Sequence, residues 1–175
     1  MHARRRIRAS HDSPAPLLIP ISRFMAALPR PAVALAVALA PLVLALGAQY
    51  GLGIRPCFLC HLQRLPWIGL ALLAATVWAR PSWERGVVVA AWGLIAVGVG
   101  LAGWHFGVEE GWFLQPSACR AAASEAASAE ELLRQIQAAP PPCGQQAWSP
   151  TGIPWPAMNA LALAAAGVLL WRGWR

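Results

Sequence analysis

The stretch that decides the fold is PCFLCHLQR, residues 56–64, which places Cys57 and Cys60 at the start of a hydrophobic segment. Two cysteines spaced C-x-x-C can close a small disulfide, coordinate a metal or carry covalent haem. A disulfide that closes a loop of about four residues stabilises a fold by only roughly 2 kcal/mol, against roughly 3.5 kcal/mol for a loop of about 25 residues. This pair is therefore a weak structural cross-link, and it suits a redox pair that opens and closes with little rearrangement.

The composition of the chain is that of a membrane protein. Of its 175 residues, 58% are hydrophobic and 12% are charged, whereas about a quarter of the residues are charged in soluble domains. The net charge of +7 comes entirely from arginine, since the chain contains no lysine. The arginines cluster beside apolar runs, as on the cytoplasmic side of membrane proteins, and do not form a nucleic-acid-binding pattern. We therefore expect a single integral membrane domain that contacts the lipid bilayer and binds no nucleic acid.

Four apolar segments are long enough to cross a bilayer as helices, since a core of about 30 Å needs roughly 20 residues at 1.5 Å each. The expected spans are residues 31–50, 58–79, 86–104 and 154–171. Residues 1–30 form a basic, proline-rich leader that we expect to be disordered, and Met25 is an alternative start. A cleaved signal peptide is a second interpretation of the first apolar run. The predicted fold is an all-α membrane protein, with a four-transmembrane-helix bundle over residues 31–175.

The distribution of arginine predicts how this bundle is oriented. Six arginines lie in the leader, two in the turn 80–85 and two at the C-terminal end, all on one side of the predicted bundle. The other side carries four arginines and five of the seven acidic residues. Because the arginine-rich side of a membrane protein is cytoplasmic, both termini are expected to be cytoplasmic. All four cysteines then face outward, into a compartment that permits disulfides.

The outer loop, expected over residues 105–153, contains one amphipathic segment. Residues 124–138 are predicted to form a short helix, because Ser128 and Glu131 fit a capping box. Its apolar residues fall on one face and are Leu132, Leu133 and Ile136. Such a helix either lies on the membrane surface or packs on the transmembrane bundle.

The same loop contains the second cysteine pair, Cys119 and Cys143. Alone, the two would form a structural disulfide. Beside a C-x-x-C pair they can also form one half of a relay, in which one pair exchanges with an outside protein and the other with the membrane. Four cysteines allow three disulfide pairings, and the residues alone do not choose among them.

Arg64 is the charged residue closest to the first cysteine pair within the second span. It follows Cys60 by four residues and Cys57 by seven, so at about 100° per residue it shares their face of the helix. The start of a helix favours the thiolate form of a cysteine, which is the form that attacks disulfides and electron acceptors. Arg64 therefore either extends to the lipid head groups or holds a carbonyl-bearing, membrane-dissolved acceptor beside Cys60.

These residues resemble the bacterial disulfide bond formation protein B (DsbB) family. The resemblance rests first on the run PCxLCxxQR, residues 56–64, and on the second cysteine pair in the outer loop. Two further matches are WHFGVE, residues 104–109, and Cys143-x-x-x-Ala147-Trp148. The resemblance covers about residues 31–171. Two departures are the long basic leader and Gly144-Gln145-Gln146, where the family commonly has an acidic residue.

The resemblance implies a multi-pass protein of the bacterial inner (plasma) membrane. Its activity would be that of a thiol:quinone oxidoreductase, which reoxidises a periplasmic DsbA-like thiol oxidase and passes electrons to the membrane quinone pool, ubiquinone or menaquinone. Cys119 would form the mixed disulfide with the partner, and Cys143 would be its bonded mate. Cys57 and Cys60 would form the membrane-side pair, with Cys60 next to the quinone. The residues implied in quinone binding are Arg64 and His105.

Three other interpretations compete with this one. Residues 57–61 also match the c-type haem attachment pattern C-x-x-C-H, with Met158 or His105 as a second axial ligand. That interpretation leaves the loop cysteines unexplained, and the motif opens a membrane helix rather than a soluble haem pocket. A four-cysteine zinc site is disfavoured because thiols on an oxidising side tend to pair, so no metal site is predicted. A purely structural membrane protein with two disulfides predicts that replacing Cys60 leaves disulfide formation unchanged.

Overall fold

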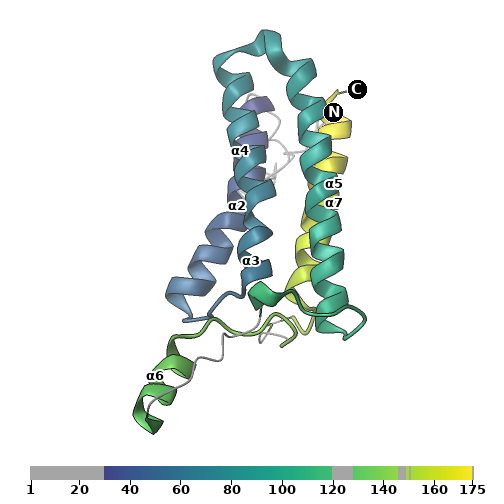
Figure 1. The fold of residues 1–175 in the computed structure, drawn as a ribbon. Coiled ribbons are helices and arrows are strands. Elements are labelled where there is room, and N and C mark those ends of the chain that lie inside the picture. The colour runs from purple at the N-terminus through teal and green to yellow at the C-terminus, as the bar shows by residue number, and fades with distance from the viewer. Residues whose placement is uncertain (1–29, 120–127, 146–148, 150, 175) are drawn as a thin grey trace, which may run out of the picture.

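The computed structural model describes residues 30–119, 128–145, 149 and 151–174, and all regular structure in these residues is helical (Figure 1). The α-helices are α2 (Arg30–Gly51), α3 (Phe58–Leu62), α4 (Arg64–Ala79), α5 (Glu84–Glu109), α6 (Ala129–Ala138) and α7 (Trp155–Trp174). Two short 3-10 helices are η1 (Pro81–Trp83) and η2 (Ser117–Cys119). Of the leader predicted to be disordered, residues 1–30, residues 1–29 lie outside the described residues, and Arg30 is helical because it begins α2.

The long helices form one elongated bundle in which α4 packs between α2 and α5, and α5 packs on α7 (Figure 1). Three helical stretches are long and apolar enough to cross a membrane: Arg30–Gly51, Phe58–Ala79 and Pro81–Glu109. The prediction of an all-α membrane protein is therefore confirmed. The helix α7 forms at the position predicted for a fourth span, but that it crosses the membrane stays a prediction. The beginning of α2, the α4–α5 turn and the end of α7 lie at one end of the bundle, and α3 lies at the other (Figure 1).

The second predicted span is interrupted at Gln63, between α3 and α4. Pro66 explains the break, because a proline inside a helix has no N–H to donate and its ring clashes with the carbonyl group four residues earlier. That carbonyl group belongs to Leu62, the last residue of α3. The short helix α3 is therefore a separate turn that carries the C-x-x-C pair.

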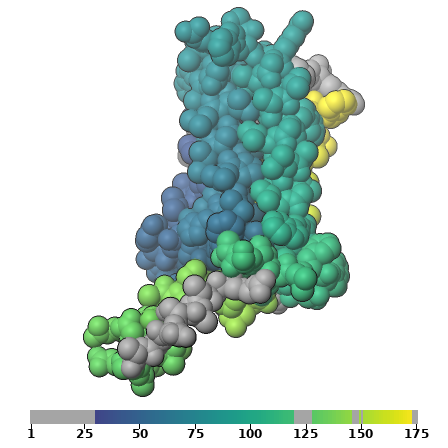
Figure 2. Space-filling view, viewed as in Figure 1, coloured from purple at the N-terminus to yellow at the C-terminus, as the bar shows by residue number. Residues whose placement is uncertain are grey.

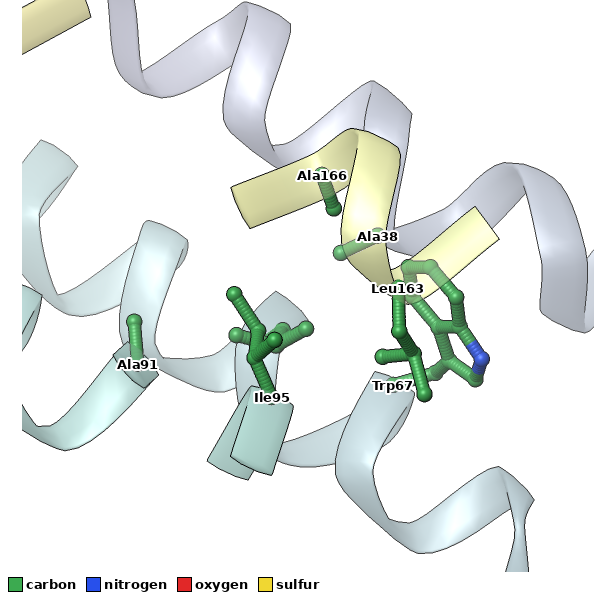
Figure 3. Packing of buried hydrophobic residues seen from close by; sticks show 7 residues of the cluster. Ala38, Trp67, Ala91, Ile95, Leu163 and Ala166 are labelled. Atoms are coloured by element: carbon green, nitrogen blue, oxygen red, sulfur yellow. The ribbon is translucent and has the colours of Figure 1, made fainter. Parts of the chain in front are cut away.

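The middle of the bundle is an apolar core to which all four long helices contribute (Figure 3). Its buried residues are Ala38, Trp67, Leu70, Ala91, Ile95, Leu163 and Ala166. Gly98 on α5 allows close contact between helices, because a Cβ atom there would lie 2.7 Å from Cδ1 of Leu163 and 3.1 Å from Cβ of Pro66. Small residues at helix contacts are how membrane helices approach one another closely.

The third helix continues past Trp104, where the apolar run suggested its end, and finishes at Glu109. A Schellman motif ends it: Gly111 has a positive φ of 76°, its N–H donates to the carbonyl of Val108, and the N–H of Trp112 donates to the carbonyl of Gly107. The last helical turns therefore carry His105 and Glu109, which the sequence had placed in the outer loop.

The predicted loop helix is present as α6, from Ala129 to Ala138, and residues 124–127 of the prediction lie outside the described residues. Ser128 is its N-cap, and its Oγ accepts a hydrogen bond of 3.2 Å from the backbone N–H of Glu131. No residue of α6 is buried, and its apolar side chains, Leu132, Leu133 and Ile136, are exposed. The helix extends away from the bundle (Figures 1 and 2). These observations oppose packing on the bundle and leave the membrane surface as the predicted location.

Candidate redox site

The first cysteine pair lies at the start of α3, as the sequence predicts. Cys57 is the N-cap of this helix, and its Sγ accepts a hydrogen bond of 3.2 Å from the backbone N–H of Cys60. The two sulfur atoms are 2.9 Å apart, and both thiols are free. Cys57 is buried, whereas Cys60 is partly accessible. We call Cys57 and Cys60 the membrane-side pair.

The surroundings of Cys57 favour its thiolate. Its pKa is lowered from the ordinary value of 9.0 to about 4. The largest cause of the lowering is the hydrogen bond from the side chain of Cys60. Burial acts in the opposite direction and raises the pKa, whereas hydrogen bonds from His105 and from the backbone N–H of Cys60 lower it further. These contacts favour the thiolate of Cys57, and a thiolate is the reactive form of cysteine.

His105 lies directly beside the membrane-side pair, although the two are far apart in sequence. Its side chain is 1% exposed, and its Nε2 lies 3.5 Å from Sγ of Cys57 and 3.5 Å from Oε1 of Glu109. Its Nδ1 lies 2.9 Å from Nε2 of Gln63. The contact between α3 and the last turns of α5 produces this arrangement. The family resemblance implied that His105 lies near a quinone ring, which stays a prediction, and the structure places His105 against Cys57.

The second cysteine pair forms a disulfide between Cys119 and Cys143, which we call the loop disulfide. Both residues are buried. They belong to the same hydrophobic cluster as Cys57, with Leu59 and Val108 as its other buried members and Cys60 packed against it. The fold therefore brings all four cysteines into one cluster. Only Cys57 and Cys60 are free thiols in the structure described.

Arg64 makes a contact that the sequence did not predict. Its guanidinium donates a hydrogen bond of 2.8 Å to Oε1 of Gln49 on α2, and the side chain is partly buried. It is thus held at the junction of α2 and α4, immediately after the break at Gln63. A direct role beside Cys60 stays a prediction.

Three functional candidates were not selected from the sequence. Gln63, on the α3–α4 junction, contacts His105, and Asn159 on α7 donates a hydrogen bond of 3.1 Å to Oε1 of Gln63. Glu109 has a side chain that is 5% exposed, and its Oε2 has no hydrogen-bond partner among the described residues. A signal was present for Asn159, because a polar side chain inside an apolar span is costly and usually marks function or a partner. Gln63 and Glu109 both lie within the motifs quoted above.

The site has the composition of a soft-metal site. Ligand atoms of Cys57, Cys60 and His105 lie within 4.8 Å of one another. The histidine of the C-x-x-C-H pattern, His61, is exposed and is not part of this group.

A separate apolar cavity of about 700 Å³ lies between α2, α4, α5 and α7 toward the other end of the bundle, and none of the four cysteines is among its lining residues.

The comparison with protein families decides the identity of the chain. A family model described as Disulfide bond formation protein DsbB matches residues 29–172. The chain belongs to the DsbB family. Neither the curated proteins nor the solved structures gave a match. As a DsbB-family member, the protein is a disulfide-bond-forming oxidoreductase of a membrane, and the shared cluster of two cysteine pairs is consistent with that chemistry.

Proposed function

We propose that this DsbB-family protein is a thiol:quinone oxidoreductase of the bacterial inner membrane. It reoxidises a periplasmic DsbA-like dithiol oxidase through Cys119 and Cys143, and passes the electrons through Cys57 and Cys60 to a membrane quinone, ubiquinone or menaquinone. The protein thereby supports disulfide formation in exported proteins.

The observation that carries the proposal is the single buried cluster that contains both cysteine pairs. Thiol–disulfide exchange requires a thiolate to reach a sulfur of the next pair. The packing of η2, which ends at Cys119, against α3 supports such an exchange, because it brings the two pairs into one cluster across a long stretch of sequence. A structural protein with two independent disulfides does not require contact between its two cysteine pairs. It also does not require one pair to be free thiols with a lowered pKa at Cys57.

We propose that electron transfer to the acceptor starts from a reduced membrane-side pair beside a closed loop disulfide. In the next step, the thiolate of Cys57 forms a bond with Sγ of Cys60, which lies 2.9 Å away. Two electrons leave the pair and the Cys60 thiol loses one proton. The quinone takes up these two electrons and two protons to become the quinol, the second proton coming from solvent. The new disulfide between Cys57 and Cys60 is re-reduced by exchange with the loop cysteines after the partner oxidase has reduced them.

The entry of electrons requires the partner to uncover the loop disulfide. Cys119 is 3% exposed and Cys143 is 1% exposed, so an incoming thiolate cannot reach either sulfur in the structure described. We propose that docking of the partner oxidase displaces the loop and allows its thiolate to attack Cys119. The bond between Cys119 and Cys143 then breaks, the mixed disulfide forms at Cys119, and Cys143 leaves as the thiolate.

Arg64 is the proposed contact for the quinone, since a guanidinium offers five donors and, among the described residues, the one side-chain hydrogen bond given for it is to Gln49. A carbonyl oxygen of a quinone is a suitable acceptor for the others. Arg64 lies at the first turn of α4, four residues after the partly accessible Cys60.

The proposal is tested by mixing the reduced partner oxidase with this protein in detergent and following the loss of absorbance of a soluble quinone. We expect turnover with the wild type and none with Cys60→Ser. His61→Ala is the matched control: its side chain is exposed, and the proposal predicts unchanged turnover. A haem absorption band in the purified protein that disappears in His61→Ala would instead establish the cytochrome interpretation.

A further inference from the structure

A continuous chain of hydrogen bonds connects the core of the bundle to Cys57. Nε1 of Trp67 donates to Oδ1 of Asn159 at 2.7 Å, and Nδ2 of Asn159 donates to Oε1 of Gln63 at 3.1 Å. Nε2 of Gln63 then lies 2.9 Å from Nδ1 of His105. Trp67 and Gln63 are buried, at 3% and 8% exposed, and the chain crosses from α4 to α7, back to the α3–α4 junction and on to α5.

The direction of every bond in this chain follows from its first donor. The indole N–H of a tryptophan can only donate, whereas an amide group presents either its oxygen or its NH2. Trp67 must therefore face the oxygen of Asn159, which turns the NH2 group of Asn159 toward Gln63. Gln63 must then accept with its oxygen and donate with its NH2 group. Nδ1 of His105 is left as an acceptor, so the proton of the neutral imidazole is on Nε2.

The other end of the chain supports the same assignment independently. Nε2 of His105 faces two groups that accept hydrogen bonds, Sγ of Cys57 and Oε1 of Glu109, both at 3.5 Å. A proton on Nε2 satisfies these acceptors, whereas a lone pair there would face negative charge. The donor at Trp67 and the acceptors at Cys57 and Glu109 thus require the same tautomer.

We propose that Trp67, Asn159 and Gln63 are positioning residues that hold the proton of His105 on Nε2. This arrangement has two consequences. His105 donates to Cys57 and stabilises it in the reduced state. It also withholds the Nε2 lone pair from thiophilic metal ions, although Cys57, Cys60 and His105 together have the ligand types and proximity of a zinc or copper(I) site.

The contrast with true metal sites is one of hydrogen-bond direction. A metal-bound histidine donates its other ring N–H to a carboxylate, a carbonyl or water, and changing that partner typically alters metal affinity by about 10- to 100-fold. Here the other ring nitrogen accepts from Gln63 instead. The chain of hydrogen bonds from Trp67 to His105 therefore keeps the reduced thiols available for electron transfer in the presence of metal ions.

The direct test is ¹⁵N NMR of the reduced protein in detergent with labelled histidine. The chain has four histidines, and a His105→Phe variant identifies the signals of His105. We expect an unprotonated Nδ1 and a protonated Nε2 in the wild type. A protonated Nδ1 in the folded wild-type protein would overturn the proposal. This measurement needs no quinone or partner, so its failure is distinguishable from failure of the proposed function.

Two variants test the role of the chain of hydrogen bonds. Gln63→Glu replaces the donor by a carboxylate, so Nδ1 should become protonated, and the reduced protein should bind Zn²⁺ at least about tenfold more tightly than the wild type. Trp67→Phe removes the fixed donor and should give a mixture of tautomers. Trp78→Phe is the matched control, since this tryptophan of α4 is 55% exposed, and it should match the wild type in both readouts. Wild-type tautomer and zinc affinity in both Gln63→Glu and Trp67→Phe would overturn the proposal.

Discussion

Replacement of Cys60 provides a quantitative test of how the site activates Cys57. The largest cause of the lowered pKa of Cys57 is the hydrogen bond from the Cys60 side chain, and the two sulfur atoms are 2.9 Å apart. Hydrogen bonds to charged groups contribute about 1.5–3 kcal/mol, and one pKa unit corresponds to about 1.4 kcal/mol. Cys60→Ala should therefore raise the pKa of Cys57 by about one to two units, from about 4 to about 5–6.

Cys60→Ser is the matched variant, because its hydroxyl group can still donate to the Cys57 thiolate. We expect its Cys57 pKa to lie below that of Cys60→Ala. The assay is the rate of alkylation of Cys57 between about pH 3.5 and 9, resolved by peptide mass spectrometry, since the rate follows the thiolate fraction. The loop cysteines do not interfere while their disulfide is closed.

Two results would refute this reasoning. A wild-type alkylation midpoint near pH 8–9, as for an ordinary thiol, would show that the surroundings of Cys57 do not stabilise its thiolate. Equal midpoints in Cys60→Ala and Cys60→Ser would show that the side chain at position 60 is not the source of the stabilisation.

Three further predictions follow from the same structure. Because the pKa of Cys57 is lowered to about 4, the reduced protein should gain stability as pH rises from about 4 toward 9 and lose it as pH falls through about 4. For the same reason, a redox titration should show the midpoint potential of the membrane-side pair falling by about 30 mV per pH unit between about pH 5 and 8. A slope near 60 mV per pH unit would contradict a Cys57 thiolate in the reduced pair. Gly98→Val should destabilise the bundle by about 1–3 kcal/mol in thermal unfolding, because its Cβ would lie 2.7 Å from Leu163, whereas Gly93→Val, with no atom within 4 Å of its Cβ, should not match that loss. Ser128→Ala should weaken α6 by about 0.5–2 kcal/mol, seen as faster amide hydrogen exchange in Ala129–Ala138, with exchange in α4 unchanged.

The sequence by itself determined those features that depend on neighbouring residues. Apolar runs of sufficient length located the helices, including the stretch Phe58–Ala79, because the bilayer requires each spanning segment to satisfy its own backbone groups. The Ser128 cap and the position of Cys57 at a helix start were likewise predictable from local spacing. The end of α5 was not, since a positive φ at Gly111 closes it five residues beyond the apolar run.

The tertiary structure alone decided which side chains meet. His105 contacts Gln63 across 42 positions in the sequence, and Asn159 contacts Gln63 across 96. The hydropathy of a segment indicates that a helix forms there but not the rotation or depth of that helix relative to its neighbours. These two quantities place a hydrogen-bond donor opposite an acceptor. For this reason the sequence identified the cysteines and His105 as candidates. Only the packed bundle shows the partner of Arg64, the direction of the hydrogen-bond chain and the cluster that both cysteine pairs share.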